Sequence, residues 1–164
     1  MGSVGSSLFL ADCVKFKGDL GDVLSDFAPC YGPGLRSKRM EEMMQELFRL
    51  QDLNQNGMLE EAELLKLNEK IAILHGADVA AAQRRFSQIF RSELDPEGRP
   101  ITFSRFRRYM FRMLDSMDPD EPTQAMIMDQ FIAEADLAIA TFPKSLKVNA
   151  GFMRVQPPVG FDKL

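Results

Sequence analysis

Apolar residues recur at helical spacing in five stretches of the chain, separated by short polar breaks. This period predicts helices over residues 38–50, 61–74 and 79–93, a fourth that ends near Met117, and a fifth over 123–142. Ser37 and Asp78 stand where helix N-caps are expected, and His75-Gly76 is a typical helix end. The run Asp118-Pro-Asp-Glu-Pro122 separates the last two helices. The pattern therefore predicts an all-α fold.

The two ends of the chain lack this period. Residues 1–36 show no regular pattern, and Cys30-Tyr-Gly-Pro-Gly34 is typical of a linker. In residues 143–164, Pro157-Pro158 and two glycines exclude a helix. The apolar residues Phe152, Val155, Val159 and Phe161 instead suggest an extended segment that lies on another surface. We therefore expect extended N- and C-terminal tails.

The most informative stretch is residues 52–63, DLNQNGMLEEAE, which fits the pattern D-x-[DN]-x-[DN]-G-x5-E without departure. Ca²⁺ takes oxygen ligands in a roughly pentagonal-bipyramidal shell, and alternate residues of a tight loop can point their oxygens inward. Gly57 permits the sharp turn because it adopts positive φ at little cost. The predicted ligands are Asp52, Asn54, Asn56, the Met58 carbonyl, Glu60 (directly or through water) and Glu63 with two oxygens.

This stretch and its flanks resemble the EF-hand calcium-binding proteins. Met44 and Phe48 precede the loop by eight and four residues, and Leu64, Leu67 and Ile71 continue an apolar stripe after it. The resemblance implies one Ca²⁺ in this loop, with Mg²⁺ as the alternative occupant at rest. A polar Asx turn between two helices is the competing interpretation. Because two ligands are Asn rather than Asp, we expect a Kd on the order of 10⁻⁶ to 10⁻⁴ M.

Residues 94–105 resemble a second loop of the same family, as in calmodulin-like pairs, but without its ligands. Leu94 and Arg105 stand where the first and last carboxylates would be. We therefore expect this loop to be metal-free, because a cation in the last ligand position opposes metal binding. The alternative is an irregular site that recruits Glu93, Asp95 and Glu97. Leu59 and Ile101 are expected to lie side by side in short paired strands, so that the second hand braces the first.

These patterns divide the chain into an N-terminal extension (1–36), an EF-hand pair (37–117), an additional helix (118–142) and an extended tail (143–164). The additional helix has no EF-hand counterpart. It could occupy the groove between the hands permanently, leave it when a target binds, or face a neighbouring subunit. Its predicted apolar stripe comprises Met128, Phe131, Ile132, Ala135, Ile139 and Phe142.

Charge and composition argue against some classes of protein. The formal net charge of −4 and a pI of about 5.1 argue against a general nucleic-acid binder. The fourth helix is nevertheless basic at Arg105, Arg107, Arg108 and Arg112, which indicates a solvated face or a docking surface for an acidic partner or an anionic membrane. No apolar run reaches the about 18 residues that span a bilayer, and no secretory signal is seen, so a cytoplasmic protein is expected. Cys13 and Cys30 lack metal-site spacing.

No phosphate loop, nucleophile elbow or zinc spacing is present, so we expect a protein that is not an enzyme. The first hypothesis is a calcium-binding regulatory or adaptor subunit that binds a protein partner through its apolar groove, its additional helix or its tails. The second is a structural subunit of a large assembly, for example cytoskeletal or axonemal, in which calcium is a static staple. The third is a membrane-associated calcium switch, because MGSVGS fits the N-myristoylation form at Gly2 and Ser6.

Overall fold

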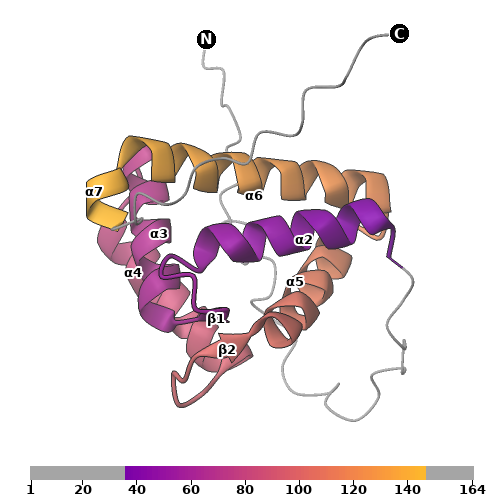
Figure 1. Ribbon diagram of the computed structural model, residues 1–164, viewed down its shortest axis with the longest axis horizontal. Coiled ribbons are helices and arrows are strands. Elements are labelled where there is room, and N and C mark those ends of the chain that lie inside the picture. Colours follow the sequence, from indigo (N-terminus) through magenta and orange to yellow (C-terminus); the bar gives the residue numbers. More distant parts are fainter. Residues whose placement is uncertain (1–35, 147–164) are drawn as a thin grey trace, which may run out of the picture.

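The structure is a computed structural model that describes residues 36–146 (Figure 1). Gly2, Ser6, both cysteines and the tail residues 147–164 lie outside this described part. The described chain is mostly helical, as predicted, with one small two-stranded sheet. Its elements are α2 (Lys38–Gln51), β1 (Met58–Leu59), α3 (Glu61–Leu74), α4 (Val79–Ile89), the π-helical turn η2 (Phe90–Leu94), β2 (Ile101–Thr102), α5 (Phe103–Met117), α6 (Glu121–Thr141) and the turn α7 (Pro143–Leu146).

The starts of α2 and α4 are fixed by side chains that accept hydrogen bonds from the first turn. Ser37 Oγ accepts from the Met40 N–H at 3.2 Å, and Asp78 Oδ1 accepts from the Ala81 N–H at 3.1 Å. These contacts confirm both predicted N-caps, since each satisfies an N–H that the helix itself leaves without a partner. α6 begins two residues earlier than predicted, with Pro122 in its first turn, where a missing N–H costs nothing.

The helices enclose one core, and α2, whose other face is exposed, crosses the middle of the view in Figure 1. α6 lies along one side of α2 and also contacts α3, while α5 packs against α2 from below in this view. Phe48 of α2 meets Phe103 and Phe106 of α5 with ring centroids 5.4 Å apart in both pairs. The first helix-loop-helix unit (α2 to α3) and the second unit (α4 to α5) therefore share an aromatic core at the base of their loops.

α6 belongs to this core. The predicted stripe is confirmed at Met128, Phe131 and Ala135, which are at most 3% exposed, and Ile132, Ile139 and Phe142 are partly buried against the same cluster. The C-cap residue of α3, His75, approaches the Glu134 carboxylate of α6 at 3.4 Å. The additional helix thus covers apolar surface that α2 and α3 would otherwise expose.

The prediction of an extended C-terminal tail is wrong for residues 143–146. Residues 143–146 were expected to be extended, but they form the helical turn α7. Pro143 fits a first helical turn, and the N–H groups of Ser145 and Leu146 donate to the Phe142 carbonyl at 3.1 and 3.0 Å. Leu146 is 1% exposed, so burial of its side chain in the core favours this turn over an extended chain.

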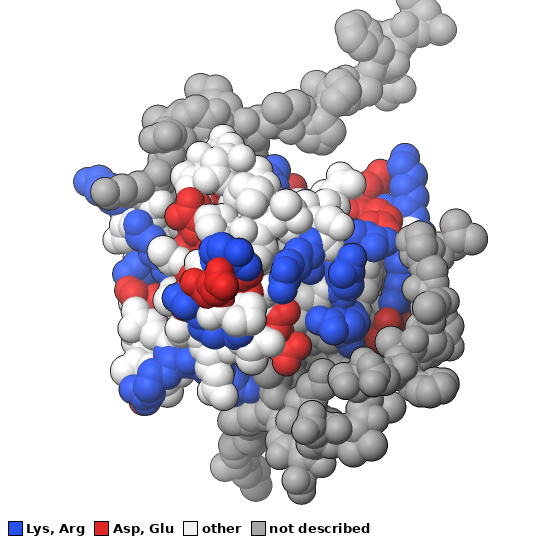
Figure 2. All heavy atoms as spheres, turned by 90° about the horizontal axis from the view of Figure 1, so that it is seen from below, with Lys and Arg blue, Asp and Glu red and all other residues white. Residues whose placement is uncertain are grey.

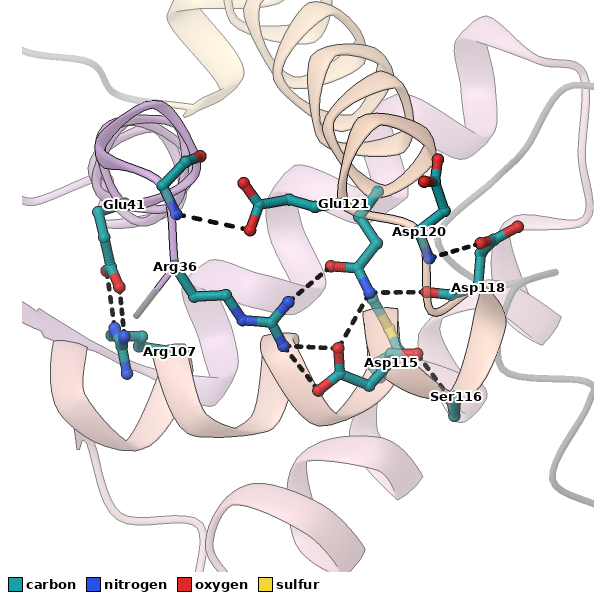
Figure 3. A network of polar contacts seen from close by, with 11 residues as sticks. Arg36, Glu41, Arg107, Asp115, Ser116, Asp118, Asp120 and Glu121 are labelled. Carbon is teal, nitrogen blue, oxygen red and sulfur yellow. Dashed lines mark hydrogen bonds and ion pairs between the residues drawn. The ribbon is translucent and has the colours of Figure 1, made fainter. Parts of the chain in front are cut away.

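A polar network joins the start of α2 to the end of α5 and the start of α6 (Figure 3). Arg36 donates to both Asp115 oxygens at 2.5 and 2.7 Å and to Gln124 Oε1 at 3.0 Å. Gln124 is fully buried, and its Nε2 donates to Asp115 Oδ1 and to the Asp118 carbonyl. Arg36, assigned from the sequence to the N-terminal extension, is therefore part of the folded unit. Of the described helices, none is both long and apolar enough to cross a membrane.

The packing of α6 can be tested with two neighbouring methionines. Met128 is fully buried, whereas Met126 is 72% exposed. We expect Met128→Ala to lower the free energy of unfolding by about 2–5 kcal/mol, because the truncation leaves a cavity. Met126→Ala, the control, should change it by less than about 0.5 kcal/mol. Urea unfolding of both variants measures this, and equal small effects would show that α6 is not packed into the core.

Candidate calcium site

The loop between α2 and α3 is organised around the Asp52 carboxylate. Asp52 follows the last residue of α2, and its own N–H still donates to the Phe48 carbonyl at 2.9 Å. Its Oδ1 accepts from the Asn56 N–H at 3.1 Å, and its Oδ2 accepts from the Gly57 N–H at 2.8 Å. Only 7% of Asp52 is exposed. The carboxylate therefore sits inside the turn and holds the backbone around itself.

The middle of the loop winds tightly and is exposed to solvent. Asn54 Oδ1 accepts from the Asn56 N–H at 2.9 Å, and Asn56 Oδ1 accepts from the Met58 N–H at 2.8 Å. Gly57 has φ +79°, which bears out the reason for a glycine there. Gln55 also has a positive φ, +59°. The sequence gives no sign of this, because glutamine is not a residue that favours the left-handed region.

Glu63 closes the loop from the first turn of α3. Its Oε1 accepts from the Asn54 N–H at 2.9 Å, and its Oε2 accepts from the Glu60 N–H at 3.0 Å. Glu60 Oε1 in turn accepts from the side-chain amides of Asn54 and Asn56, each at 3.3 Å. The start and the end of the twelve-residue segment thus meet, and all six predicted ligand residues belong to one hydrogen-bonded network. Met58 belongs to it through its N–H, which donates to Asn56 Oδ1.

The negative charge at this closure is costly. Glu63 is 7% exposed. Burial raises the pKa of its carboxyl, the hydrogen bonds from the Glu60 and Asn54 backbones lower it, and the negative charges of Asp52 and Glu60 raise it further. A cation between these groups would relieve both the burial cost and the mutual repulsion.

The oxygen-bearing groups of loop 52–63 are of the kind that a hard cation binds, but they do not form a cluster of carboxylates alone. Within residues 36–146, no three side chains among His, Cys, Asp and Glu form a cluster that could hold a metal ion. A cation in loop 52–63 would therefore depend on amide and carbonyl oxygens from Asn54, Asn56 and Met58 as well as on carboxylates. Each carboxylate oxygen of Asp52 and Glu63 accepts one N–H and retains a lone pair for such an ion.

The second loop is built differently from the expectation. Leu94, predicted as its first residue, is the last residue of η2 and is 1% exposed in the core. The π-helical turn adds one residue, so that the Asp95 N–H donates to the Phe90 carbonyl at 2.8 Å, five residues back. Asp95 consequently takes the place at the helix end that Asp52 takes in the first loop. The predicted start of the loop is therefore one residue too early, while Ile101 keeps its predicted place opposite Leu59.

Asp95 carries its own counter-ion. Its carboxylate accepts from the Arg99 N–H at 2.8 Å, the Glu97 N–H at 3.2 Å and Arg99 Nη2 at 3.0 Å. The hydrogen bonds from the Arg99 side chain and backbone lower the pKa of Asp95 to about 2. Arg105, which the sequence pointed to as the opposing cation, is exposed on α5. An arginine therefore occupies the position that an ion would take at Asp95, and the cation is Arg99.

The two loops lie side by side. β1 and β2 pair antiparallel with Met58 opposite Thr102 and Leu59 opposite Ile101, which confirms the predicted contact of Leu59 with Ile101. Glu61, directly after the first loop, accepts from Arg91 Nε at 2.8 Å and from Ser87 Oγ at 2.6 Å. The Arg91 guanidinium also covers Gly98, where a Cβ would lie 2.3 Å from it. These contacts, which the sequence did not predict, tie the first loop to the second unit.

The Asp95–Arg99 contact makes a prediction about acid stability. Because the folded-state pKa is below the usual 3.8, the contact stabilises the fold fully above that value, and the benefit disappears as the pH falls through about 2. We expect Asp95→Asn to lower the melting temperature at pH 6, and the difference from the native protein to shrink between pH 4 and pH 2. Thermal unfolding followed by circular dichroism measures this. Glu97→Gln, at an exposed pair, is the control, and a pH-independent difference for Asp95→Asn would contradict the assignment.

Comparisons of the chain with protein-family models, with functionally characterised proteins and with solved structures find no match.

Proposed function

We propose that this protein binds one Ca²⁺ in the loop 52–63 and acts as a non-enzymatic regulatory or adaptor subunit of EF-hand type. The observation that carries the proposal is the closure of the loop by Glu63, whose carboxylate reaches back to the Asn54 N–H while Asp52 holds Asn56 and Gly57. Oxygen-bearing residues from both ends of the segment thereby share one hydrogen-bonded turn, which supports a calcium loop.

The proposed ligands are the six predicted from the sequence: Asp52, Asn54, Asn56, the Met58 carbonyl, Glu60 and Glu63. Bound Ca²⁺ would supply the positive charge that compensates the buried Asp52 and Glu63 carboxylates. Three carboxylates and two neutral amides favour the weaker end of the sensor range, on the order of 10⁻⁵ M. Mg²⁺, which is smaller and loses its water reluctantly, is the weaker competitor for the same oxygens.

The second unit is proposed as a structural brace of an EF-hand pair. It supplies β2 to pair with β1 and places Arg91 against Glu61 at the start of α3. Its loop needs no ion because Arg99 already neutralises Asp95. One metal-binding and one metal-free loop in a pair is therefore the arrangement that these contacts support.

The position of α6 supports a second candidate, in which calcium is a static staple of a structural subunit. A calcium sensor must expose apolar surface on its helices. Here Met128, Ala135 and Ala138 of α6, each at most 1% exposed, cover α2 and α3. In the regulatory proposal, calcium must loosen α6 before a protein partner can bind that surface. In the staple proposal, α6 stays in place.

Calcium binding is tested by titration calorimetry on the full chain. We expect one site with a Kd on the order of 10⁻⁵ M, and loss of at least tenfold in affinity for Glu63→Gln, since the closing ligand loses its charge. Glu93→Gln, which lies beside the second loop, is the matched control and should bind as the native protein does. Absence of binding heat in the native protein at millimolar calcium would refute the proposal.

Hydrogen exchange of α6 amides separates the two candidates. The regulatory proposal predicts faster exchange over Glu121–Thr141 when calcium is added, because α6 must leave α2 and α3. The staple proposal predicts equal or slower exchange with a higher melting temperature. Glu63→Gln should show neither change. Slower α6 exchange with calcium would rule out the regulatory mechanism but leave calcium binding itself intact.

A further inference from the structure

Charge is unevenly distributed along the described chain. Residues 84–112 contain eight Lys or Arg and three Asp or Glu, a net charge of +5, although the whole protein carries −4. Residues 113–142 contain seven Asp or Glu and no Lys or Arg, a net charge of −7. An acidic protein therefore carries a strongly basic segment next to a strongly acidic one. Like charges gathered on one face repel each other, so this separation of basic and acidic residues requires a physical explanation.

The basic segment forms one surface. Arg105, Arg108 and Arg112 are all exposed and, at spacings of three and four residues, lie on the outer face of α5. We define these three residues as the basic face. Figure 2, which views the molecule from the side where β1, β2 and α5 lie in Figure 1, shows Lys and Arg spread widely over this side.

Most of these arginines do not stabilise the fold through a hydrogen bond or a close ion pair with the described residues. Arg105 and Arg108 take part in no hydrogen bond or ion pair within residues 36–146, and Arg112 approaches only Glu93, at 4.0 Å. Arg107, on the same helix, is different: it pairs with Glu41 and lies 4.8 Å from the Phe111 ring. The chain thus separates one arginine that stabilises the fold from others whose charge is left available at the surface.

The acidic helix α6 lies mostly on another side. In Figure 1, α6, which holds Asp129 and Asp136, runs along the opposite side of α2 from α5, and its start meets the end of α5 where Gln124 donates to Asp115. Close to a negatively charged surface, such a molecule turns its basic face inward and its acidic helix outward. The hollow formed by Met40, Ala125 and Met126, into which a peptide side chain could fit, lies between α2 and α6 and not on the basic face. A flat polyanion needs only charge, whereas a peptide also needs pockets for its side chains.

We propose that the basic face of Arg105, Arg108 and Arg112 docks on an anionic lipid surface. Each arginine near such a surface adds attraction that is screened by salt beyond about 8 Å at physiological ionic strength. The interaction does not require bound calcium, since the three charges that carry it lie outside the loop 52–63. It also does not require a lipid on Gly2, although an acyl chain there would supply a second membrane signal.

The test uses the full chain, unmodified at Gly2, with vesicles of phosphatidylcholine alone or with about one-third phosphatidylserine, in the presence of a chelator. Co-sedimentation should occur with the anionic vesicles only and should weaken as salt rises. Arg105→Gln with Arg108→Gln should reduce the partition constant roughly 25-fold, at about fivefold per arginine. Because neither arginine forms a hydrogen bond or ion pair with the residues that the structure describes, the melting temperature should not change.

The matched control is Lys38→Gln with Lys144→Gln, which removes the same charge from α2 and α7 beside the two ends of α6. This control should bind within about twofold of the native protein. An equal loss for both pairs would mean that only net charge matters and would overturn the assignment of the face. Absence of binding to anionic vesicles would refute the proposal, and binding to poly-glutamate in that case would assign the face to an acidic protein.

Discussion

Two buried carboxylates, one at each end of the first loop, are the constraint on which the described structure depends. Asp52 caps the end of α2 and Glu63 lies in the first turn of α3, and each accepts two backbone N–H groups of the intervening turn. Together they fix the angle at which α2 enters the loop and α3 leaves it. That angle sets where β1 lies, and β1 places β2 and the whole second unit through Leu59 and Ile101. Burying two like charges near each other is unfavourable unless hydrogen bonds or a cation compensate them, so the most informative part of the fold is also its most costly part.

In the second loop, the charge of the carboxylate at the helix end is compensated without an external ion. Asp95 stands at a helix end and accepts backbone N–H groups as Asp52 does, but Arg99 delivers a guanidinium to it from four residues away. The π-helical turn makes this possible, because one extra residue in the helix moves Asp95 into place and sends Leu94 into the core. The pair therefore contains one carboxylate turn with a built-in cation and one without. This contrast, more than the loss of ligand residues, explains why a cation is expected in one loop only.

How much of this could be predicted from the sequence depends on the range of the interaction. Helix positions, the caps at Ser37 and Asp78, the stripe on α6 and the contact of Leu59 with Ile101 follow from periodicity and spacing, which are local signals. The π-helical turn was missed because it changes hydrogen bonding without changing the apolar period around Phe86 and Phe90. The Arg91 contacts and the Arg36 network were missed because they join residues far apart in sequence. The positive φ of Gln55 is imposed by the loop around it and leaves no trace in residue type.

The proposed calcium loop and the proposed lipid-binding face lie near the same end of the fold, so their charges act on each other. The loop 52–63 lies beside the second loop through the β1–β2 pair, and α5 with Arg105 begins directly after β2. Asp52, Glu60 and Glu63 thus place negative charge near the basic face, and this charge opposes approach to an anionic surface. A bound Ca²⁺ would reduce that opposition by two charges, so calcium and anionic lipid would strengthen each other's binding, by the same factor in both directions. The coupling is limited by salt screening over about 8 Å, so it is largest for Arg105 and fades along α5 toward Arg112.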